Sequence, residues 1–341
     1  MKNDKKPSRG HAIALYSGGL DSALAILLIL KQNIKVTALT FLTNFGCDIS
    51  DSSSCGSDPY PAAEKFGFDV KLMHLGQKFI DIVKSPKHGY GKNMNPCIDC
   101  RILMLREAAL FMKTVKADFV ITGEVVGQRP KSQHRPTLHL IEKESGLEGF
   151  LLRPLSARLL SETIPERNGL VDRNLLEGIS GRSRKRQLEL AREFGLEDYS
   201  APAGGCLLTD VNYSKRLKDL LAHNHNPDSN DISLLRYGRH FRLDSKTRLI
   251  VGRDEADNDR LQNQARPEYL TLEALGVGSP LALCIGNHSA ENVRLAAAIT
   301  ARYSDAGKMP QVVITCSAHD RQWKVTVHPI AKSETVNFQI K

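Results

Sequence analysis

Short apolar runs alternate with stretches of helical periodicity along the first half of the chain. Strands are expected at 11–16, 35–42, 69–75, 118–122 and 150–154, and helices at 23–30, 62–66, 76–83 and 101–116. The last helix is amphipathic, because Ile102, Leu105, Ala109 and Met112 lie near one face. Strands that alternate with helices predict an α/β fold with a doubly wound parallel sheet, whose ligand binds at the carboxyl ends of the strands.

The pattern divides the rest of the chain into two further parts. A basic helical segment is expected at 176–245, with helices through Phe194 and at 212–223, after a first domain at 1–175. From 246 to 341 the apolar runs at 248–251, 281–285, 312–315 and 323–327 surround an alanine-rich helix at 290–303. This last part is predicted to be a smaller α/β domain.

A glycine-bearing turn, Y-S-G-G-L-D-S at 16–22, connects the first strand to the first helix. Its glycines allow a close approach of backbone to a ligand, and the helix start supplies N–H groups and the positive end of a dipole. Asp21 and Ser22 are residue types that cap helix N-termini. Neither G-x-x-x-x-G-K-[ST] nor G-x-G-x-x-G follows the strand. The turn therefore predicts a phosphate site of another kind, and the alternative is a plain connection.

Composition and charge narrow the class of protein. The chain has 341 residues, 41% of them hydrophobic and 25% charged, which is typical of a soluble protein of two or more domains. It contains no apolar stretch of roughly 18 residues that could span a membrane, and its N-terminus is polar, so we expect a cytoplasmic protein without a membrane partner. The net charge of +9 favours a polyanionic partner, although a basic soluble enzyme would also carry it.

Three of the seven cysteines stand in positions that suggest chemistry. Cys97 and Cys100 form C-x-x-C at the expected start of a helix, where the dipole would lower the thiol pKa, and Cys206 follows two glycines. Three thiolates suit an iron–sulfur cluster with one iron open. Zinc would need a fourth ligand such as His88 or His134. Another interpretation is that Cys206 and one cysteine of the C-x-x-C pair act as a persulfide and its resolving thiol. The final interpretation is that the C-x-x-C cysteines are only structural.

The other four cysteines are interpreted as structural or incidental. Cys47 and Cys55 lie in a polar loop and match no metal-binding spacing, whereas Cys284 and Cys316 lie in apolar runs and are expected in the core.

Two groups of basic residues are candidates for RNA contact. Arg129 and Lys131 lie in a polar loop after the strand at 118–122, where this architecture places the rim of the active site. The second group is formed by Arg182, Arg184, Lys185 and Arg186. Cations at a helix start suit nucleic-acid phosphates, and a solvated surface is the alternative.

Four motifs together carry a family resemblance. The S-G-G-x-D-S turn resembles the fingerprint of the PP-loop ATP pyrophosphatases. With N-P-C-I-D-C, G-E-V-V-G-Q-R-P and P-A-G-G-C, the stretch 13–213 resembles the tRNA thiouridine synthetases that form 4-thiouridine or 2-thiouridine. The part after Leu249 is similar to the RNA-binding domain of some ribosome quality-control factors. Because the PP-loop begins by residue 17, we expect tRNA to dock on the basic middle segment or the C-terminal domain, not on an N-terminal RNA-binding domain.

The resemblance implies that 1–175 is an adenylation domain that binds ATP. By that resemblance the pyrophosphate is held by Ser17, Gly18, Gly19 and Ser22. Asp21 would help to place Mg²⁺, and Gly123 would lie near the adenine. ATP would adenylate a uridine carbonyl oxygen, which sulfur then replaces.

The resemblance also implies a source for the sulfur. Cys97, Cys100 and Cys206 would hold a [4Fe–4S] cluster, or one of them would carry a persulfide. The expected partners are tRNA and a sulfur donor, either sulfide or a persulfide carrier, and a homodimer is compatible with the sequence. A PP-loop ligase of another kind and a non-catalytic RNA-binding module remain as alternatives.

Overall fold

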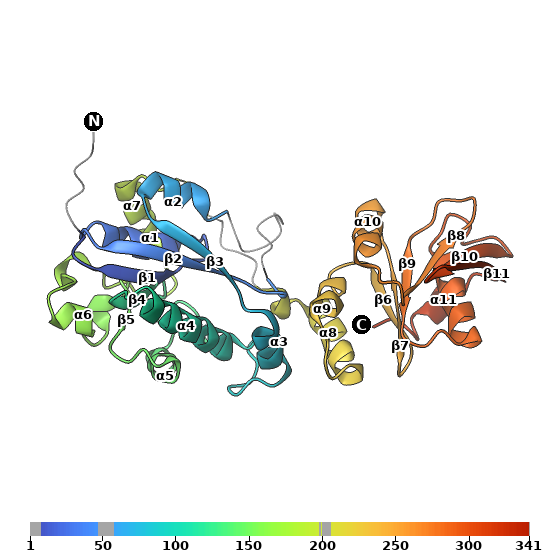
Figure 1. Ribbon diagram of the computed structural model, residues 1–341, viewed down its shortest axis with the longest axis horizontal. Helices are drawn as coiled ribbons and strands as arrows, with labels where there is room; N and C mark the ends of the chain where they lie inside the picture. The colour runs from blue at the N-terminus through green and yellow to red at the C-terminus, as the bar shows by residue number, and fades with distance from the viewer. Residues whose placement is uncertain (1–7, 47–57, 198, 200–205, 341) are drawn as a thin grey trace. The chain divides into compact units, whose positions relative to one another are not determined.

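The computed structural model describes residues 8–46, 58–197, 199 and 206–340, and it contains two compact units, Met1–Thr209 and Asp210–Lys341 (Figure 1). Cys47 and Cys55 therefore lie outside the described residues.

The first unit is built on a five-stranded sheet with the order β3-β2-β1-β4-β5. The strands are β1 (His11–Leu15), β2 (Lys35–Leu42), β3 (Asp69–His74), β4 (Phe119–Thr122) and β5 (Leu151–Leu152). Every neighbouring pair is parallel, which confirms the predicted parallel sheet. The chain builds β2 and β3 on one side of β1 and then continues with β4 on the other. The ligand site of such a sheet lies where the strand order reverses, here beyond the carboxyl ends of β1 and β4.

Helices cover both faces of this sheet (Figure 1). They are α1 (Leu20–Leu30), α2 (Tyr60–Phe66), α3 (Gly76–Lys84), α4 (Cys97–Thr114), α5 (Arg135–Ser145), α6 (Ile164–Arg167) and α7 (Lys185–Phe194), with short 3₁₀ turns at Ala157–Leu159, Arg173–Leu175 and Leu207–Thr209. In β1, Ala12 and Ala14 pack into the core formed with α1 and α7. Ile13 and Leu15 point to the opposite face and pack with α4. The alternation of side chains along a strand thus gives two cores, as a doubly wound fold requires.

The second unit is an antiparallel sheet of six strands in the order β11-β10-β8-β9-β7-β6. Its elements are α8 (Val211–His223), α9 (Ser229–Leu234), β6 (Arg239–Asp244), β7 (Thr247–Val251), α10 (Glu255–Gln264), β8 (Leu270–Ala274), β9 (Ala282–Ile285), α11 (Ala290–Arg302), β10 (Val312–Ala318), β11 (Arg321–Val327) and α12 (Lys332–Thr335). The core on one face forms around α11, and Leu234 of α9 and Leu261 of α10 belong to the core on the other. Cys284 and Cys316 are fully buried, as predicted, and burial raises their thiol pKa values to about 12 and about 11.

The basic middle segment does not form a unit of its own. Leu190 and Ala191 of α7 pack into the core with α1, so this part of the segment belongs to the first unit. Beyond Thr209, Tyr213 of α8 is buried and its hydroxyl donates to the Ile232 carbonyl (3.4 Å), which ties α8 to α9 in the second unit. The segment is divided because each helix buries its apolar stripe against a different sheet.

Among the residues that the structure describes, no helix is both long and apolar enough to cross a membrane.

Candidate functional site

The turn after β1 forms a cradle at the predicted position. Gly18 has φ +73°, a conformation that favours glycine, and α1 begins at Leu20 with Gly19 as its N-cap. Asp21 and Ser22 therefore lie in the first turn of α1 and do not cap it, contrary to the sequence prediction. Ser22 Oγ donates to the Gly19 carbonyl (2.8 Å) and accepts from the Ser17 N–H (3.3 Å). These bonds hold the turn in shape while the first N–H groups of α1, which have no intrahelical partners, face the turn.

Gly123 brings the end of β4 against the start of α1. A Cβ on this residue would lie 2.5 Å from the Asp21 carbonyl carbon and oxygen and 2.5 Å from the Ser22 nitrogen. Only glycine permits this approach, because real Cβ atoms do not come so close to backbone. The structure thus explains Gly123 by packing under the cradle, and its predicted place near the adenine stays a prediction.

Asp21 is the charged side chain of the cradle. Its Oδ2 accepts from Gln128 Nε2 (3.1 Å) and lies 3.9 Å from Arg184 Nη2. Its Oδ1 is buried and has no hydrogen-bond partner among the described residues, and the same is true of Arg184 Nε. A buried carboxylate oxygen without a partner is costly, so it is suited to receive a cation. The donor set therefore fits the Mg²⁺ that the sequence prediction places here.

Two loops that are distant in sequence meet beside Asp21. Gly181 N donates to the Val126 carbonyl (2.8 Å), and Val126 forms a parallel bridge with Ser180. This pairing brings Gln128 and Arg184 to the same carboxylate. Sequence reasoning assigned Arg184 to RNA, but the structure places it at the phosphate cradle. The run of cations gave no sign of this, because the signal lies in the pairing of the two loops.

A buried charge network supports the loop after β4. Glu124 is 2% exposed, with Oε1 3.2 Å from Arg101 Nε and Oε2 3.2 Å from Arg153 Nε, and it accepts from the Thr122 hydroxyl (3.1 Å). Burial alone would raise the Glu124 pKa, but the two guanidinium groups outweigh it and hold the pKa below its usual value. Because Arg101 belongs to α4, the network connects the helix of the cysteines to the end of β4 beside the cradle.

The structure brings the three predicted cysteines into one neighbourhood. Cys97 and Cys100 lie in the first turn of α4, and Cys206 directly precedes the 3₁₀ turn at 207–209. That turn is bound to the loop before α4, since Asn93 Nδ2 donates to the Thr209 carbonyl (2.7 Å) and Met94 N to the Leu208 carbonyl (3.1 Å). Cys97 and Cys206 are close enough to act electrostatically on the Cys100 thiol. Two distant stretches of sequence thus supply neighbouring thiols within one unit.

The expectation of a low thiol pKa at the helix start is wrong for Cys100. Burial of this thiol raises its pKa to about 12. Arg101 opposes the increase, and the nearby Cys206, Cys97 and Asp99 add to it. Desolvation therefore outweighs the helix dipole, and Cys100 is protonated at neutral pH until a bound metal displaces the proton.

Lys131 connects the loop beside the cradle to the segment beside the cysteines. Its ammonium donates to the Tyr90 carbonyl, and a Cβ on the next residue, Gly91, would lie 3.2 Å from Cys97 Sγ. The loop that carries Lys131 also carries Gln128, which contacts Asp21. A single loop therefore contacts both the cradle and the segment beside Cys97.

Among the described residues, no group of three or more His, Cys, Asp or Glu side chains is arranged to hold a metal ion such as zinc. His88, a candidate fourth ligand for zinc, lies 3.2 Å from the Glu144 carboxylate instead. The three neighbouring thiols have the donor chemistry of an iron–sulfur cluster, whose ligands are set farther apart than those of one ion.

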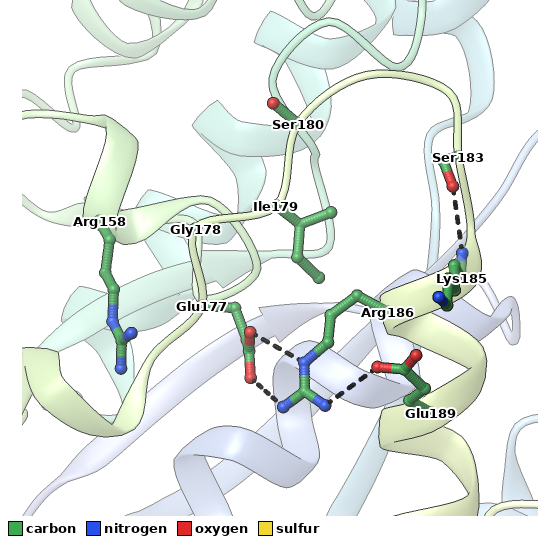
Figure 2. Close-up of a pocket in the computed structure, with 9 residues that line it drawn as sticks. All are labelled: Arg158, Glu177, Gly178, Ile179, Ser180, Ser183, Lys185, Arg186 and Glu189. Atoms are coloured by element: carbon green, nitrogen blue, oxygen red, sulfur yellow. Dashed lines mark hydrogen bonds and ion pairs between the residues drawn. The ribbon is translucent and has the colours of Figure 1, made fainter.

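The predicted RNA-contact residues differ in their surroundings. Arg129, Lys131, Arg182 and Lys185 are exposed. Arg186 instead donates to both carboxylate oxygens of Glu177 (3.2 and 2.7 Å) and to Glu193 (2.7 Å), and these bonds raise its pKa. Figure 2 shows Arg186 between Glu177 and Glu189. These residues line a hollow of about 650 Å³. Because Arg186 is already matched by carboxylates, its guanidinium is less suited to RNA phosphates than the exposed cations.

Family models match both units. Residues 7–161 match the model described as "Thiamine biosynthesis protein (ThiI)". This stretch is a ThiI-type PP-loop domain. Residues 238–339 match the model described as "NFACT protein RNA binding domain", so the second unit carries an RNA-binding-type domain. The predicted family resemblance is confirmed for both units.

Two curated relatives resemble the ThiI-type half of the chain. The tRNA-specific 2-thiouridylase MnmA of Chlorobaculum tepidum is 27% identical over 191 residues, which cover 54% of this chain and 48% of the relative. The tRNA sulfurtransferase of Blochmanniella pennsylvanica is 28% identical over 174 residues, covering 47% of this chain and 35% of the relative. The chain therefore spans about half of the first relative and about a third of the second.

The solved structures are more remote. A 4-thiouridine synthetase in complex with RNA and ATP is 19% identical, with a TM-score of 0.35, over 55% of this chain and 52% of that one. The C-terminal part of a fibronectin/fibrinogen-binding protein from Streptococcus suis is 15% identical, with a TM-score of 0.28, over 46% of this chain and 77% of that one. At these TM-scores both likenesses are distant.

Proposed function

We propose that this protein is a cytoplasmic enzyme that uses ATP to replace a carbonyl oxygen of a tRNA uridine with sulfur. The observation that carries the proposal is the loop of Gln128 and Lys131, which contacts the phosphate cradle at Asp21 and the segment beside Cys97. ATP activation and thiol chemistry can therefore act on one uridine. The names of the two relatives, a tRNA 2-thiouridylase and a tRNA sulfurtransferase, support the same reaction.

The first half of the reaction uses the cradle. The N–H groups at the start of α1 and the hydroxyls of Ser17 and Ser22 would bind the phosphates of ATP. The Asp21 Oδ1 atom, which lacks a partner in the described part of the chain, would hold Mg²⁺. The uridine carbonyl oxygen attacks the α-phosphorus and the bond to the β-phosphate breaks, which releases pyrophosphate and leaves AMP on the oxygen. Arg184, next to Asp21, is placed to neutralise the charge of the departing pyrophosphate.

The second half replaces the activated oxygen. Sulfur at the oxidation level of sulfide attacks the ring carbon, and AMP leaves with the oxygen, so the balance needs no oxidant or reductant. A [4Fe–4S] group held by Cys97, Cys100 and Cys206 would supply an open iron that binds and activates the sulfur. Lys131, fixed by the Tyr90 carbonyl beside the cysteine segment, would hold the tRNA backbone or the leaving AMP near the thiols.

One observation favours a second candidate for the sulfur carrier. Without a metal, the Cys100 thiol with its pKa of about 12 is a poor nucleophile. A persulfide mechanism would therefore use Cys97 and Cys206, with the partly buried Cys100 as a neighbour. In that case the persulfide sulfur is transferred, and an external thiol must reduce the disulfide that remains.

Docking of tRNA would use charge on both units. The exposed Arg129 and Arg182 lie on the two loops that meet at the cradle, and the exposed Lys185 begins α7 directly after one of them, so they can hold backbone phosphates around the target uridine. The second unit, with its RNA-binding-type domain, would bind another part of the tRNA.

The test is product formation by purified protein under anaerobic conditions. ATP, tRNA and sulfide are supplied, and nucleosides are analysed by mass spectrometry for thiouridine. We expect thiouridine from the wild type, and none from Cys97→Ser, Cys100→Ser or Cys206→Ser if the cluster is used. A persulfide mechanism predicts loss with Cys97→Ser and Cys206→Ser but retention with Cys100→Ser.

A matched control is Cys284→Ser, a buried thiol of the second unit that should leave the yield per folded protein unchanged. Full thiouridine formation by all three cysteine variants would contradict the proposed role of the thiols, and release of pyrophosphate without thiouridine from the wild type would favour a PP-loop ligase. Binding of tRNA without release of pyrophosphate would favour a non-catalytic RNA-binding module.

A further inference from the structure

A small polar pocket lies in the second unit, and none of the residues that line it takes part in the proposed reaction. Its volume is about 200 Å³, and it is formed by α8 and α9 on one side and by the hairpin of β6 and β7 on the other. The charged and polar side chains that line it include His223, Asn224, Asp231, Arg242, Lys246 and Arg248.

Arg248 is the central side chain of this pocket. It is only 6% exposed, and its Nη2 donates to Asp231 Oδ1 (2.5 Å). Its Nη1 is also buried but has no hydrogen-bond partner in the part of the chain that the structure describes. A buried charged donor without an acceptor costs free energy comparable to a lost charged hydrogen bond, so the site is incomplete as it stands. What is missing is an acceptor.

The neighbouring charges make an anion the natural acceptor. Asp231 is already shared, because its Oδ2 also accepts from Asn224 Nδ2 (3.0 Å). Arg242 is paired with Asp219, with Nε 3.2 Å from its carboxylate. Lys246 is exposed at the hairpin turn, and its ammonium has no ion pair among the described residues. Two residues that line the pocket, Lys246 and Arg248, therefore carry a cationic group without an anionic partner among the described residues: the Lys246 ammonium and the Nη1 of Arg248.

We propose that this pocket binds a single phosphate group between Arg248 Nη1 and the Lys246 ammonium. The volume admits a phosphate with a few waters but is too small for a whole nucleotide. Guanidinium and ammonium groups are the side chains that bind phosphate, the first by directed hydrogen bonds and the second as a point charge.

The sequence positions suggest where the phosphate comes from. Arg242, Lys246 and Arg248 lie within 238–339, which match the RNA-binding domain model, while His223 and Asp231 lie on the two helices before it. An RNA backbone phosphate is the first expected source, and this step rests on the proposed tRNA substrate. A free phosphomonoester has the same chemistry and is the second source. In either case the matched domain needs α8 and α9 to complete the site.

The test uses hydrogen exchange of the full-length protein, because this method locates the bound group. Inorganic phosphate and tRNA are added in separate experiments, and exchange is followed in peptides covering 239–251. We expect slower exchange there with both. Binding at the cradle of residues 16–22 is distinguished, since that site is read from different peptides.

Two variants remove the two phosphate contacts without breaking a buried pair. Arg248→Lys keeps a cation for Asp231 but removes Nη1. Lys246→Ala changes an exposed side chain, so we expect it to fold like the wild type. We expect either variant to weaken the phosphate effect about tenfold, and Lys246→Ala to lower the salt slope of tRNA binding by about one. Lys308→Ala, an exposed lysine of the same unit outside the pocket, is the matched control and should leave the exchange in 239–251 unchanged.

The outcomes separate the sources and the two proposals. Protection by both ligands, lost in both variants, supports an RNA phosphate. Protection by inorganic phosphate alone supports the site but assigns it to a small phosphomonoester. No protection by either ligand, or protection that both variants retain, overturns the proposal. Because protection by inorganic phosphate needs no thiolation, a failure of the proposed enzyme activity would be seen separately.

Discussion

Gly123→Ala tests the contact on which the geometry of the cradle depends. The added Cβ would lie 2.5 Å from three backbone atoms of Asp21 and Ser22, whereas ordinary contacts are at 3.4–4 Å. Backbone must therefore move by about 1 Å, and overpacking of this kind costs about 1–3 kcal/mol. Because the displaced atoms belong to the first turn of α1, we also expect ATP to bind at least about tenfold more weakly, or about 1.4 kcal/mol.

The assay combines thermal unfolding of the first unit with calorimetric titration of ATP, and two other glycines serve as controls. At Gly19, where φ is −84°, a Cβ would meet only Ser17 Oγ at 3.5 Å, so Gly19→Ala should keep stability but weaken ATP binding by occupying the cradle. At Gly178 the nearest atom is Arg158 Cβ at 3.4 Å, so Gly178→Ala should change neither quantity. Wild-type stability and ATP affinity in Gly123→Ala would refute the close packing.

Three further predictions address charges. Arg184→Ala should slow the release of pyrophosphate about tenfold or more with little change in tRNA affinity. Lys185→Ala should instead weaken tRNA binding with little change in pyrophosphate release. Equal effects of the two variants in both assays would contradict the placement of Arg184 at the cradle. Glu124→Gln leaves two guanidinium groups without their buried carboxylate and should destabilise the first unit by about 3–5 kcal/mol in denaturant unfolding. The folded state lowers the pKa of Glu124, so above its usual pKa of 4.5 the carboxylate adds to the free energy of unfolding. This contribution is lost as the pH falls through the folded pKa. The free energy of unfolding of Glu124→Gln should lack this dependence on pH. Burial, with Arg216 and Arg248 nearby, lowers the pKa of His240 well below 6.5, so below that pH the unfolded state binds a proton that the folded state does not. The free energy of unfolding of the second unit should therefore fall by about 1.4 kcal/mol per pH unit below about 6.5. His240→Gln should lack this slope.

The strands and most helices of the first unit were predictable because each has a strong local pattern, whereas α5 and α6 were not predicted. The run from His11 to Leu15 is apolar, it ends at the glycines, and the helix that follows is apolar throughout, so the strand, the cradle and the parallel sheet followed from the sequence. The first turn of α4 and its cysteines were predicted in the same way. Local pattern suffices where a segment is buried on a regular period.

The strands β6 and β8 were missed for the opposite reason. In β6 (Arg239–Asp244) only Phe241 and Leu243 are apolar, and they pack into the core around α11, while the remaining residues are polar or charged, so no apolar run marks the strand. The antiparallel sheet of the second unit was likewise not visible from single segments. Strand pairing between distant segments decides both features, and no local window contains it.

The roles of single charges were the least predictable part of the site. Arg184 and Arg186 are two positions apart in the same basic run, yet the first lies at Asp21 and the second is neutralised by Glu177 and Glu193. For Cys100, helix position suggested a low pKa, but burial reversed the direction. These outcomes depend on partners supplied by tertiary contacts, which composition and spacing do not report.

The most direct test of the shared site is a single-turnover experiment with ATP labelled at the α-phosphorus and an excess of protein over tRNA. In the wild type with sulfide, we expect labelled AMP and thiolated tRNA in equal amounts. In Cys97→Ser and Cys206→Ser, activation should proceed while sulfur transfer fails, so that label accumulates on tRNA and pyrophosphate is released once per tRNA. If these variants place no label on tRNA, or if the wild type forms thiouridine without releasing AMP, activation and sulfur transfer are not coupled in one site.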